Sequence, residues 1–435
     1  MPAASATELA ERLAAIVGDE HVAPAAEPVT PGLPTPIAVS PATLEEAAQA
    51  LAAARAAGAA VAPHGGGTQQ RIGAGPERCD VALRTERLRG VLDWEPGDLT
   101  AGLQAGLTLA GTQRTLAEQG QQLPIDAPVA ERATLGGLVA TNTAGPRRWA
   151  HGGWRDLVIG MEMALADGSV IKSGGRVVKN VQGYDLAKLF IGSLGTLGLI
   201  GRINVKLAPL PETRRIVVAR GGLAPASTLC ADVAGSQLRV AAVDLLNAEA
   251  AAACGLPVAG WAVLVLLEGR RAVVNGQSDA VSRLARSAGL LPDTIDSPAL
   301  EGLWRRWVDL GSVDELDGHE ALLTVPLPPA EATDAVQVVE REAAERGLRS
   351  RLWLRAGIGT LYARMRAADP LRLVAAQSAL LRRWPATLLT AGSPVLAAAA
   401  KPWGEEPATL PVLRAIKQQF DPERVLNPGR FVGGI

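Results

Sequence analysis

The sequence TLGGLVATNTAG at Thr134–Gly145 opens the stretch that decides the fold, Thr134–Ile200. It continues through VIGMEMALADGSVIKSGG at Val158–Gly175 and closes with GYDLAKLFIGSLGTLGLI at Gly183–Ile200. Glycines recur throughout, separated by short runs of Leu, Val and Ile. So many glycines in an apolar sequence indicate a main chain that adopts positive φ angles or approaches another group closely. We expect an ordered, backbone-lined slot for a large flat cofactor rather than a disordered segment.

A second glycine cluster, Gly65-Gly66-Gly67-Thr68, lies in the loop PHGGGTQQRIG at Pro63–Gly73. Three consecutive glycines expose successive N–H groups, and the threonine hydroxyl adds one more group, which together suit the oxygens of a pyrophosphate. The loop has neither the GK[ST] ending of a Walker loop nor the GxGxxG dinucleotide pattern. A phosphate-binding loop and a plain tight turn are both open interpretations.

Length and composition exclude several classes of protein. The chain has 435 residues, 48% hydrophobic and 20% charged, which is typical of a globular protein of two or three domains. A net charge of −1 gives no support for binding to nucleic acid or to an anionic membrane. No apolar run is long enough to span a membrane. The N-terminus, MPAASATELAERLAAIVG, has no cationic start before an apolar core and is not a secretory signal.

The residues that usually hold metals are few and scattered. The cysteines form no CxxC pair and are Cys79, Cys230 and Cys254. An iron–sulfur cluster normally takes four thiolates, so the chain cannot hold such a cluster alone, and the cysteine count fits a reducing compartment. The histidines are His21, His64, His151 and His319. None of them forms a local pair, and we expect no metal site.

Local patterns predict the elements around the two glycine-rich regions. Ser40 and Pro41 combine a capping hydroxyl with proline and predict a helix that runs through 44–57 and ends at Gly58. Short strands are expected at 59–62 and 81–85, hairpins at 91–106 and 157–173, a strand at 199–207, and helices at 109–119, 184–190, 331–347, 369–383 and 410–420. The mixture predicts an α+β fold.

The proline-bounded segment APLPET, which contains Pro209 and Pro211, marks the expected domain boundary because glycine becomes less frequent after it. We expect an N-terminal helix and linker at 1–34, a first domain at 35–212, a second α+β domain at 213–400, and a C-terminal segment at 401–435.

The motifs HGGGT, TLGGLVATNTAG, GYDLAKLFIGSLGTLGLI and FDPERVLNPGR, taken in order, resemble the FAD-binding flavoproteins of the vanillyl-alcohol oxidase or PCMH type. Within that type, the motifs are most similar to the accessory FAD-binding component of bacterial glycolate oxidase (glycolate dehydrogenase). The resemblance covers Pro41–Pro211 and the C-terminal segment. It implies a PCMH-type FAD-binding domain of two α/β subdomains, a cap domain over the isoalloxazine, and a C-terminal segment that returns to the FAD domain.

The resemblance also implies cofactor-binding residues. The pyrophosphate loop is Pro63, His64, Gly65, Gly66, Gly67, Thr68 and Gln69. The turn against the flavin and pyrophosphate is Thr134, Leu135, Gly136 and Gly137, and the segment after it is Thr141, Asn142, Thr143, Ala144 and Gly145. Leu199 and Ile200 match the adenine end, Pro124 and Asp126 match contacts before the turn, and Asn427 matches a position near the flavin ring.

Two departures from the family pattern bear on the chemistry. Relatives with covalent flavin often carry histidine where this chain has Thr68, which implies noncovalent FAD. Catalytic relatives that act on 2-hydroxy acids carry a His-x-His metal motif, whereas only His319 follows His151 here. The general base is therefore unknown, with His151, Tyr184 and His319 as candidates, and His64 is expected to support the loop by hydrogen bonding.

Three further groups each have two interpretations. Arg147, Arg148 and Arg155 suit a carboxylate or phosphate, or an internal ion pair or solvated surface. Lys179, Asn180 and Tyr184 in KNVQGYD are expected to order a turn by hydrogen bonding, with contact between Tyr184 and the isoalloxazine as the alternative. Trp304-Arg305-Arg306-Trp307 is either a partner-binding site or a helix that buries one tryptophan.

The leading hypothesis is an FAD-dependent oxidoreductase acting on CH–OH groups, as an accessory subunit of a glycolate oxidase. It would take part in oxidising glycolate, a small 2-hydroxy acid, to glyoxylate, together with a catalytic flavoprotein subunit and an iron–sulfur subunit. Two alternatives are a self-sufficient FAD-dependent dehydrogenase of another 2-hydroxy acid or alcohol, and a non-catalytic scaffold that retains the fold. We expect a cytoplasmic protein, or one held at the inner membrane through its complex.

Overall fold

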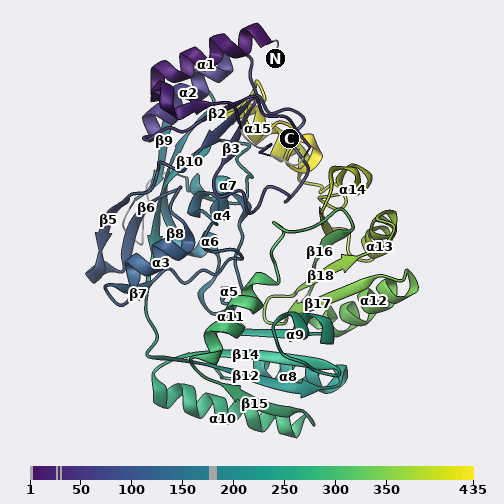
Figure 1. The fold of residues 1–435 in the computed structure, drawn as a ribbon. Helices are drawn as coiled ribbons and strands as arrows, with labels where there is room; N and C mark the ends of the chain where they lie inside the picture. The colour runs from purple at the N-terminus through teal and green to yellow at the C-terminus, as the bar shows by residue number, and fades with distance from the viewer. Residues whose placement is uncertain (1–2, 26–27, 30–31, 176–183) are drawn as a thin grey trace.

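The computed structural model describes the whole chain except residues 1–2, 26–27, 30–31 and 176–183. Four β-sheets organise it, and helices pack against the sheets as shown in Figure 1. The combination of parallel and antiparallel sheets with helices confirms the α+β prediction.

The first sheet has four strands in the order β1 (Val22–Ala23), β2 (Ile37–Val39), β4 (Val81–Arg84) and β3 (Val61–His64). Strands β2, β4 and β3 are parallel. Helices α1 (Ala3–Val17) and α2 (Leu44–Ala56) share an apolar core with these strands. The Pro63–Gly73 loop therefore leaves the carboxyl end of a parallel strand, where ligands bind in open α/β sheets.

The predicted start of helix α2 was wrong. Its N-cap is Thr43, whose hydroxyl accepts a hydrogen bond from the amide of Glu46, 3.0 Å away. The Ser40 hydroxyl instead donates to the Glu86 carboxylate at 2.7 Å. Thr43 and Glu46 have the spacing of a capping box, and that spacing favours Thr43 over Ser40.

The second sheet is antiparallel, in the order β5 (Val91–Glu95), β6 (Thr100–Gln104), β10 (Leu199–Lys206), β8 (Val158–Ala164) and β9 (Val170–Gly174). Both predicted hairpins are present in it. Helices α3 (Leu109–Ala117), α4 (Leu135–Thr141), α6 (Trp154–Leu157) and α7 (Ala187–Phe190) contribute to its core. Strands β11 (Ala208–Pro209) and β7 (Gln121–Gln122) form a separate, short antiparallel pair.

The third large sheet has eight antiparallel strands. Their order is β15 (Leu291–Ile295), β12 (Thr213–Gly221), β14 (Trp261–Gly269), β13 (Ala242–Leu246), β17 (Arg349–Arg355), β18 (Thr360–Arg366), β16 (Glu320–Pro326) and β19 (Leu388–Ala391). One face packs on α8 (Leu223–Gly235), α10 (Arg271–Ser287), α12 (Ala332–Glu345), α13 (Leu371–Leu381) and α14 (Pro394–Ala399). The other packs on α9 (Ala248–Ala253) and α11 (Ala299–Asp309).

The C-terminal segment returns to the first sheet, where the yellow end of the chain lies beside the purple N-terminal elements in Figure 1. Helix α15 (Leu410–Phe420) has the predicted bounds. After it, Val61 donates to the carbonyl of Val425 at 2.7 Å, and Asn427 donates to the carbonyl of Val61 at 2.9 Å. The segment thus pairs with β3 immediately before the glycine-rich loop.

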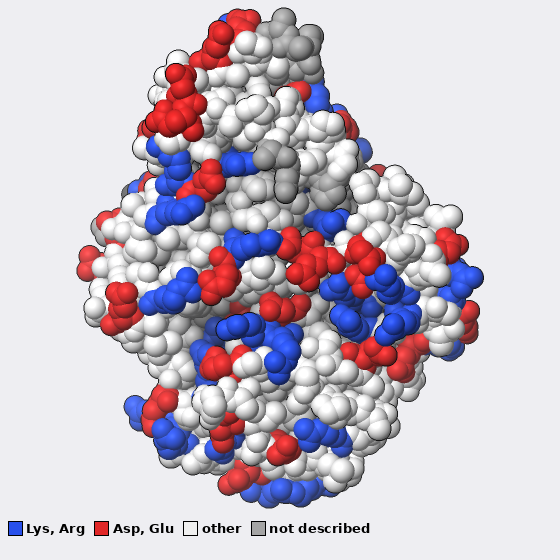
Figure 2. All heavy atoms as spheres, in the orientation of Figure 1, with Lys and Arg blue, Asp and Glu red and all other residues white. Residues whose placement is uncertain are grey.

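Positive and negative side chains are interspersed over the face shown in Figure 2, in keeping with the net charge of −1. In the part of the chain that the structure describes, no helix combines the length and the apolar character that crossing a membrane requires.

Candidate functional site

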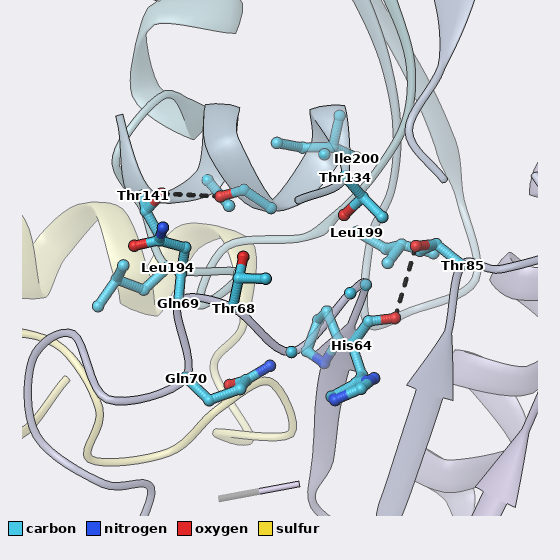
Figure 3. Close-up of a pocket in the computed structure, with 18 of the residues that line it drawn as sticks. His64, Thr68, Gln69, Gln70, Thr85, Thr134, Thr141, Leu194, Leu199 and Ile200 are labelled. Carbon is cyan, nitrogen blue, oxygen red and sulfur yellow. Dashed lines mark hydrogen bonds between the residues drawn. The ribbon is translucent and has the colours of Figure 1, made fainter. Parts of the chain in front are cut away.

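A crevice lies between the loop after β3, the start of α4 and the start of β10, and contains about 640 Å³ of empty space, its open mouth included. Figure 3 shows side chains from these elements around it, with His64, Thr68 and Gln70 on the loop and Thr134 and Thr141 at α4.

The two glycine-rich regions of the sequence pack against each other at this crevice. A Cβ atom on Gly65 would lie 2.0 Å from the hydroxyl oxygen of Thr134, and a Cβ on Gly66 would lie 1.8 Å from the carbonyl oxygen of Arg132. Gly67 has a φ of +75°. Only glycine permits this close approach, so the loop residues are fixed by contact with the chain that enters α4.

The loop presents unused main-chain donors. Within the described residues, the amides of Gly65, Gly66 and Gly67 donate no hydrogen bond. The carbonyl of His64 accepts the amide of Thr85 at 2.9 Å, which ties the start of the loop to the end of β4. Three free amides on a fixed loop form an anion-binding concavity.

The opposite wall combines α4 with the turn before β10. The Thr141 hydroxyl donates to the carbonyl of Gly137 at 2.9 Å, so this side chain is held against its own helix. Leu194 and Gly195 both have positive φ angles, 53° and 68°. The amide of Leu194 donates to the carbonyl of Ala140 at 2.8 Å and joins the turn to α4.

A buried ion pair holds this turn to the C-terminal segment. The ammonium of Lys417 lies 2.6 Å from the Asp421 carboxylate and also donates to the carbonyls of Thr196 and Leu426, at 2.8 Å and 3.0 Å. Asn427 adds a bond from its amide nitrogen to the carbonyl of Leu194 at 2.8 Å. The C-terminal segment therefore sets the position of the Leu194–Thr196 turn.

His64 is neutral at physiological pH. Burial is the main cause, and the positive charge of Arg84 adds to it, so that the pKa of His64 is lowered to about 4. The imidazole is 3.4 Å from the position of a Cβ on Gly67. The predicted support of the loop comes mainly from the His64 carbonyl rather than from its ring.

Arg430 is the main feature of the crevice that sequence reasoning missed. It lines the crevice and is only 4% exposed. Burial lowers the pKa of Arg430 to about 10. The residue ends the quoted motif LNPGR, but nothing in the motif indicates that its side chain turns inward to the glycine-rich loop.

Most of the predicted cofactor-binding residues line the crevice: Pro63, His64, Gly65, Gly66, Gly67, Thr68, Gln69, Thr134, Gly136, Gly137, Thr141, Leu199 and Ile200. The others do not line it: Pro124, Asp126, Leu135, Asn142, Thr143, Ala144, Gly145 and Asn427. Lining residues that were not predicted are Gln70, Thr85, Ala140, Leu194, Gly195, Gly198 and Arg430.

Asp126 belongs to a separate buried charge cluster. Arg147 lies 2.8 Å from the Asp126 carboxylate and 3.6 Å from that of Glu268, and His151 lies 2.8 Å from Glu268. Burial alone lowers the pKa of Arg147, but the two carboxylates more than offset this and hold it above the ordinary value. The internal ion pair is thus the correct interpretation of Arg147, whereas Arg148 and Arg155 are exposed.

The three candidate bases do not line the crevice. His151 faces Glu268, the ring of His319 lies 3.2 Å from the carbonyl of Ala367, and Tyr184 is 92% exposed. Lys179 and Asn180 lie outside the described residues. No group of three or more His, Cys, Asp or Glu side chains in the described chain is arranged to hold a metal ion.

The WRRW segment forms part of α11. Trp307 is 1% exposed and its indole donates to the Asp244 carboxylate at 2.7 Å, while Trp304 is half-buried against it. Burial is the main cause that raises the pKa of Asp244 to about 6. The helix that buries one tryptophan is the interpretation that agrees with the structure.

Solved structures share this architecture over nearly the whole chain. p-Cresol methylhydroxylase superposes with a TM-score of 0.77 at 15% identity, covering 99% of this chain and 97% of that one. 4-Ethylphenol oxidase from Gulosibacter chungangensis gives the same score and coverage at 17% identity. The chain has the PCMH-type FAD-binding fold.

Two domain families match parts of the sequence. Residues 35–174 match the FAD binding domain family, and residues 399–431 match the C-terminal domain of FAD linked oxidases. These two matches contain the glycine-rich loop, the α4 turn and Asn427. Over these residues the chain therefore carries an FAD binding domain and the C-terminal domain found in FAD linked oxidases.

Curated relatives of the PCMH-type chain act on hydroxy acids. Glycolate oxidase subunit GlcD of Bacillus subtilis is 26% identical over 85% of this chain and 83% of its own length. Glycolate oxidase subunit GlcE of Escherichia coli is 40% identical, but over 28% of this chain and 36% of its own length. D-2-hydroxyglutarate dehydrogenase of Xanthomonas citri pv. viticola is 33% identical over 42% of this chain and 39% of its own length. The matches to the last two thus span little more than a third of those relatives.

The crevice fits FAD on its own chemistry. The free amides of the Gly65–Gly67 loop suit a pyrophosphate, and a side chain at Gly65 or Gly66 would collide with the chain that enters α4. Beside the crevice, the Oδ1 of Asn427 has no hydrogen-bond partner among the described residues, although Asn427 is only 1% exposed. Buried polar atoms are normally satisfied, so this oxygen is a further candidate for contact with a bound group.

Proposed function

We propose that this chain is the FAD-binding subunit of a glycolate oxidase complex, in which glycolate is oxidised to glyoxylate and electrons pass to an iron–sulfur partner. The observation that carries the proposal is the shared crevice between the Gly65–Thr68 loop and the Thr134–Gly137 turn. The similarity to GlcE, at 40% identity over the aligned segment, supports the choice of complex.

In this proposal the residues of the chain bind and orient the cofactor. The loop amides hold the pyrophosphate, Leu199 and Ile200 contact the adenine end, and the α4 turn supports the flavin. When bound, FAD supplies an acceptor for the two electrons and the hydrogen of the substrate α-carbon. Thr68 is 5% exposed and offers a hydroxyl rather than an imidazole, so the FAD is noncovalent.

The accessory role rests on the position of the candidate bases. A general base must reach the substrate hydroxyl within hydrogen-bond distance. His151 is engaged with Glu268, His319 with a main-chain carbonyl, and Tyr184 is exposed to solvent. A separate catalytic flavoprotein subunit would provide the base and the metal ligands that the sequence lacks. The complex would lie in the cytoplasm or at the inner membrane.

Purification of the chain alone tests this proposal. The absorbance spectrum should show a flavoprotein, precipitation with acid should release intact FAD, and glycolate should reduce the flavin poorly. Mass spectrometry of proteins that copurify from the native host should find a second flavoprotein and an iron–sulfur protein. A chain that cannot be loaded with FAD contradicts the proposal, and so does rapid glycolate oxidation by the isolated chain.

A second candidate is a self-sufficient dehydrogenase of another 2-hydroxy acid. The observation in its favour is that the alignment with GlcD covers 83% of that subunit, far more than the alignment with GlcE covers of its own. Anaerobic addition of D-lactate, D-2-hydroxyglutarate and glycolate to the FAD-loaded chain distinguishes the two. Full bleaching within seconds by D-lactate or D-2-hydroxyglutarate, with slow bleaching by glycolate, favours this second candidate.

A further inference from the structure

Arg430 places a cation inside the cofactor crevice. Its side chain lines the crevice and the residue is 4% exposed. One terminal nitrogen donates to the side-chain oxygen of Gln70 at 2.7 Å, and the other lies 3.4 Å and 3.3 Å from the carbonyls of Gln69 and Gln70. The guanidinium is thereby held against the end of the glycine-rich loop.

The guanidinium of Arg430 has no carboxylate partner among the residues that the structure describes. Across the described residues, no carboxylate lies within 4.0 Å of its guanidinium, and its Nε has no hydrogen-bond partner. A buried ion without a counter-charge costs several kcal/mol. Buried charges are ordinarily paired, so a cation of this kind that lines a cavity indicates an anionic group of a ligand.

We propose that Arg430 supplies the counter-charge for the pyrophosphate of the bound dinucleotide, together with the amides of Gly65–Gly67. This inference rests on the proposed FAD binding. The same loop carries both features: three free amides at its start and the Arg430 guanidinium at Gln69 and Gln70. Phosphate groups accept several charge-assisted hydrogen bonds from a guanidinium, which is a rigid fork of donors.

The pyrophosphate suits Arg430 better than the other anions that a flavoprotein of this class handles. A substrate carboxylate is present only during turnover, and a reduced flavin ring is anionic only after reduction. The pyrophosphate keeps its charge in every state of the loaded protein. It therefore removes the cost of the buried cation at all times.

Binding measurements on the full-length protein freed of FAD test the inference. The variants are Arg430→Gln and Arg430→Lys, with Arg414→Gln as the control because Arg414 is exposed and lies on α15 in the same C-terminal segment. FAD affinity is measured by quenching of flavin fluorescence, and the affinity for ADP by its displacement of FAD. ADP carries the pyrophosphate without the flavin.

Arg430→Gln should lower the affinities for FAD and for ADP by the same factor, about 10- to 100-fold. This factor corresponds to the usual contribution of hydrogen bonds to a charged group. Arg430→Lys should recover part of this loss, and Arg414→Gln should change neither affinity. The thermal midpoint of the FAD-free protein should not fall in Arg430→Gln, since the variant removes an unpaired buried charge.

The inference is overturned by unchanged FAD affinity in Arg430→Gln, by a loss for FAD with none for ADP, or by ADP that fails to displace FAD from the unmodified chain. If Arg430→Gln does not fold, the Arg430→Lys variant decides by the same comparison of FAD with ADP. An unmodified chain that binds no FAD contradicts the proposed function itself, whereas normal FAD binding with an indifferent Arg430 contradicts only this inference.

Discussion

Arg147 and Arg430, two of the buried arginines in the described part of the chain, are equally inaccessible at 4% exposed but have opposite surroundings. Arg147 has two carboxylates within 4 Å, and its pKa is raised in spite of burial. Arg430 has no carboxylate at that distance among the described residues, and burial lowers its pKa to about 10. Arg147 joins the second sheet region to the eight-stranded sheet, whereas Arg430 lines the crevice.

We interpret Arg147 as a structural charge and Arg430 as a charge that a bound ligand would neutralise. Arg147, Arg214 and His151 lie within 4 Å of the Glu268 carboxylate, and Arg147 also pairs with Asp126, so each charge of this cluster has a counter-charge inside the protein. The crevice differs, because it combines the free amides of the glycine-rich loop with a cation that has no carboxylate within 4.0 Å among the described residues. We expect substitutions in the cluster to change stability and substitutions in the crevice to change binding.

The largest effect is expected when the complete cluster is broken. Arg147→Met leaves the carboxylates of Asp126 and Glu268 buried with less compensation and should lower the free energy of unfolding by about 3–5 kcal/mol. Urea unfolding of the chain measures this. The control is Arg114→Met, because Arg114 and Glu131 form an exposed pair that should contribute about 0–1 kcal/mol. Equal effects of the two variants would remove the distinction between buried and exposed pairs.

Lys417 is an intermediate case between Arg147 and Arg430, because its ion pair with Asp421 is internal but supports the crevice. Lys417→Met should cost about 3 kcal/mol of unfolding free energy. The variant should also lower the affinity for FAD, because the carbonyls of Thr196 and Leu426 lose their hydrogen-bond donor. Lys401→Met is the control: Lys401 and Glu405 have the same spacing but are exposed. A Lys417 variant with normal stability and normal FAD affinity would contradict the role assigned to the C-terminal segment.

The sequence alone was sufficient for much of the fold but only part of the site. Hairpins, the Gly-ended helix and α15 follow from local patterns, and both glycine-rich regions that stand out in the sequence line the crevice. Arg430, Leu194 and Thr85 reach the crevice through pairing of distant segments, such as Val425 with Val61, which no local pattern encodes. Asp126 matched a family position, yet its nearest cation is Arg147.

A smaller effect is expected at Gly66. In Gly66→Ala the new methyl group would meet the carbonyl of Arg132, so the loop must move away from the α4 wall. Overpacking of this kind costs about 1–3 kcal/mol, and we expect FAD affinity to fall by about 10- to 100-fold. Gly97→Ala is the control, because a Cβ on Gly97 has nothing within 4 Å. Flavin fluorescence titration of both variants makes the measurement, and equal affinities would show that the close approach at Gly66 is dispensable.

The smallest effect near neutral pH is expected at His64. Its folded pKa of about 4 lies below the ordinary value of 6.5. Below pH 6.5 the unfolded chain takes up a proton that the folded chain does not, so stability is complete above pH 6.5 and is lost as the pH falls toward 4. His64→Gln should flatten this part of the stability profile in urea unfolding at several pH values. An identical pH profile in the variant would mean that His64 is not the group responsible.

Hydrogen exchange of the chain with and without FAD, followed by mass spectrometry, tests most directly that the crevice is the cofactor site. We predict that FAD slows exchange of the amides in 61–72, 132–142, 194–200 and 424–432, the four segments that contribute residues to the main walls of the crevice. Exchange at the Arg147 cluster should change little. Protection confined to another region, such as the cavity lined by Leu109 and Trp304, would contradict the account.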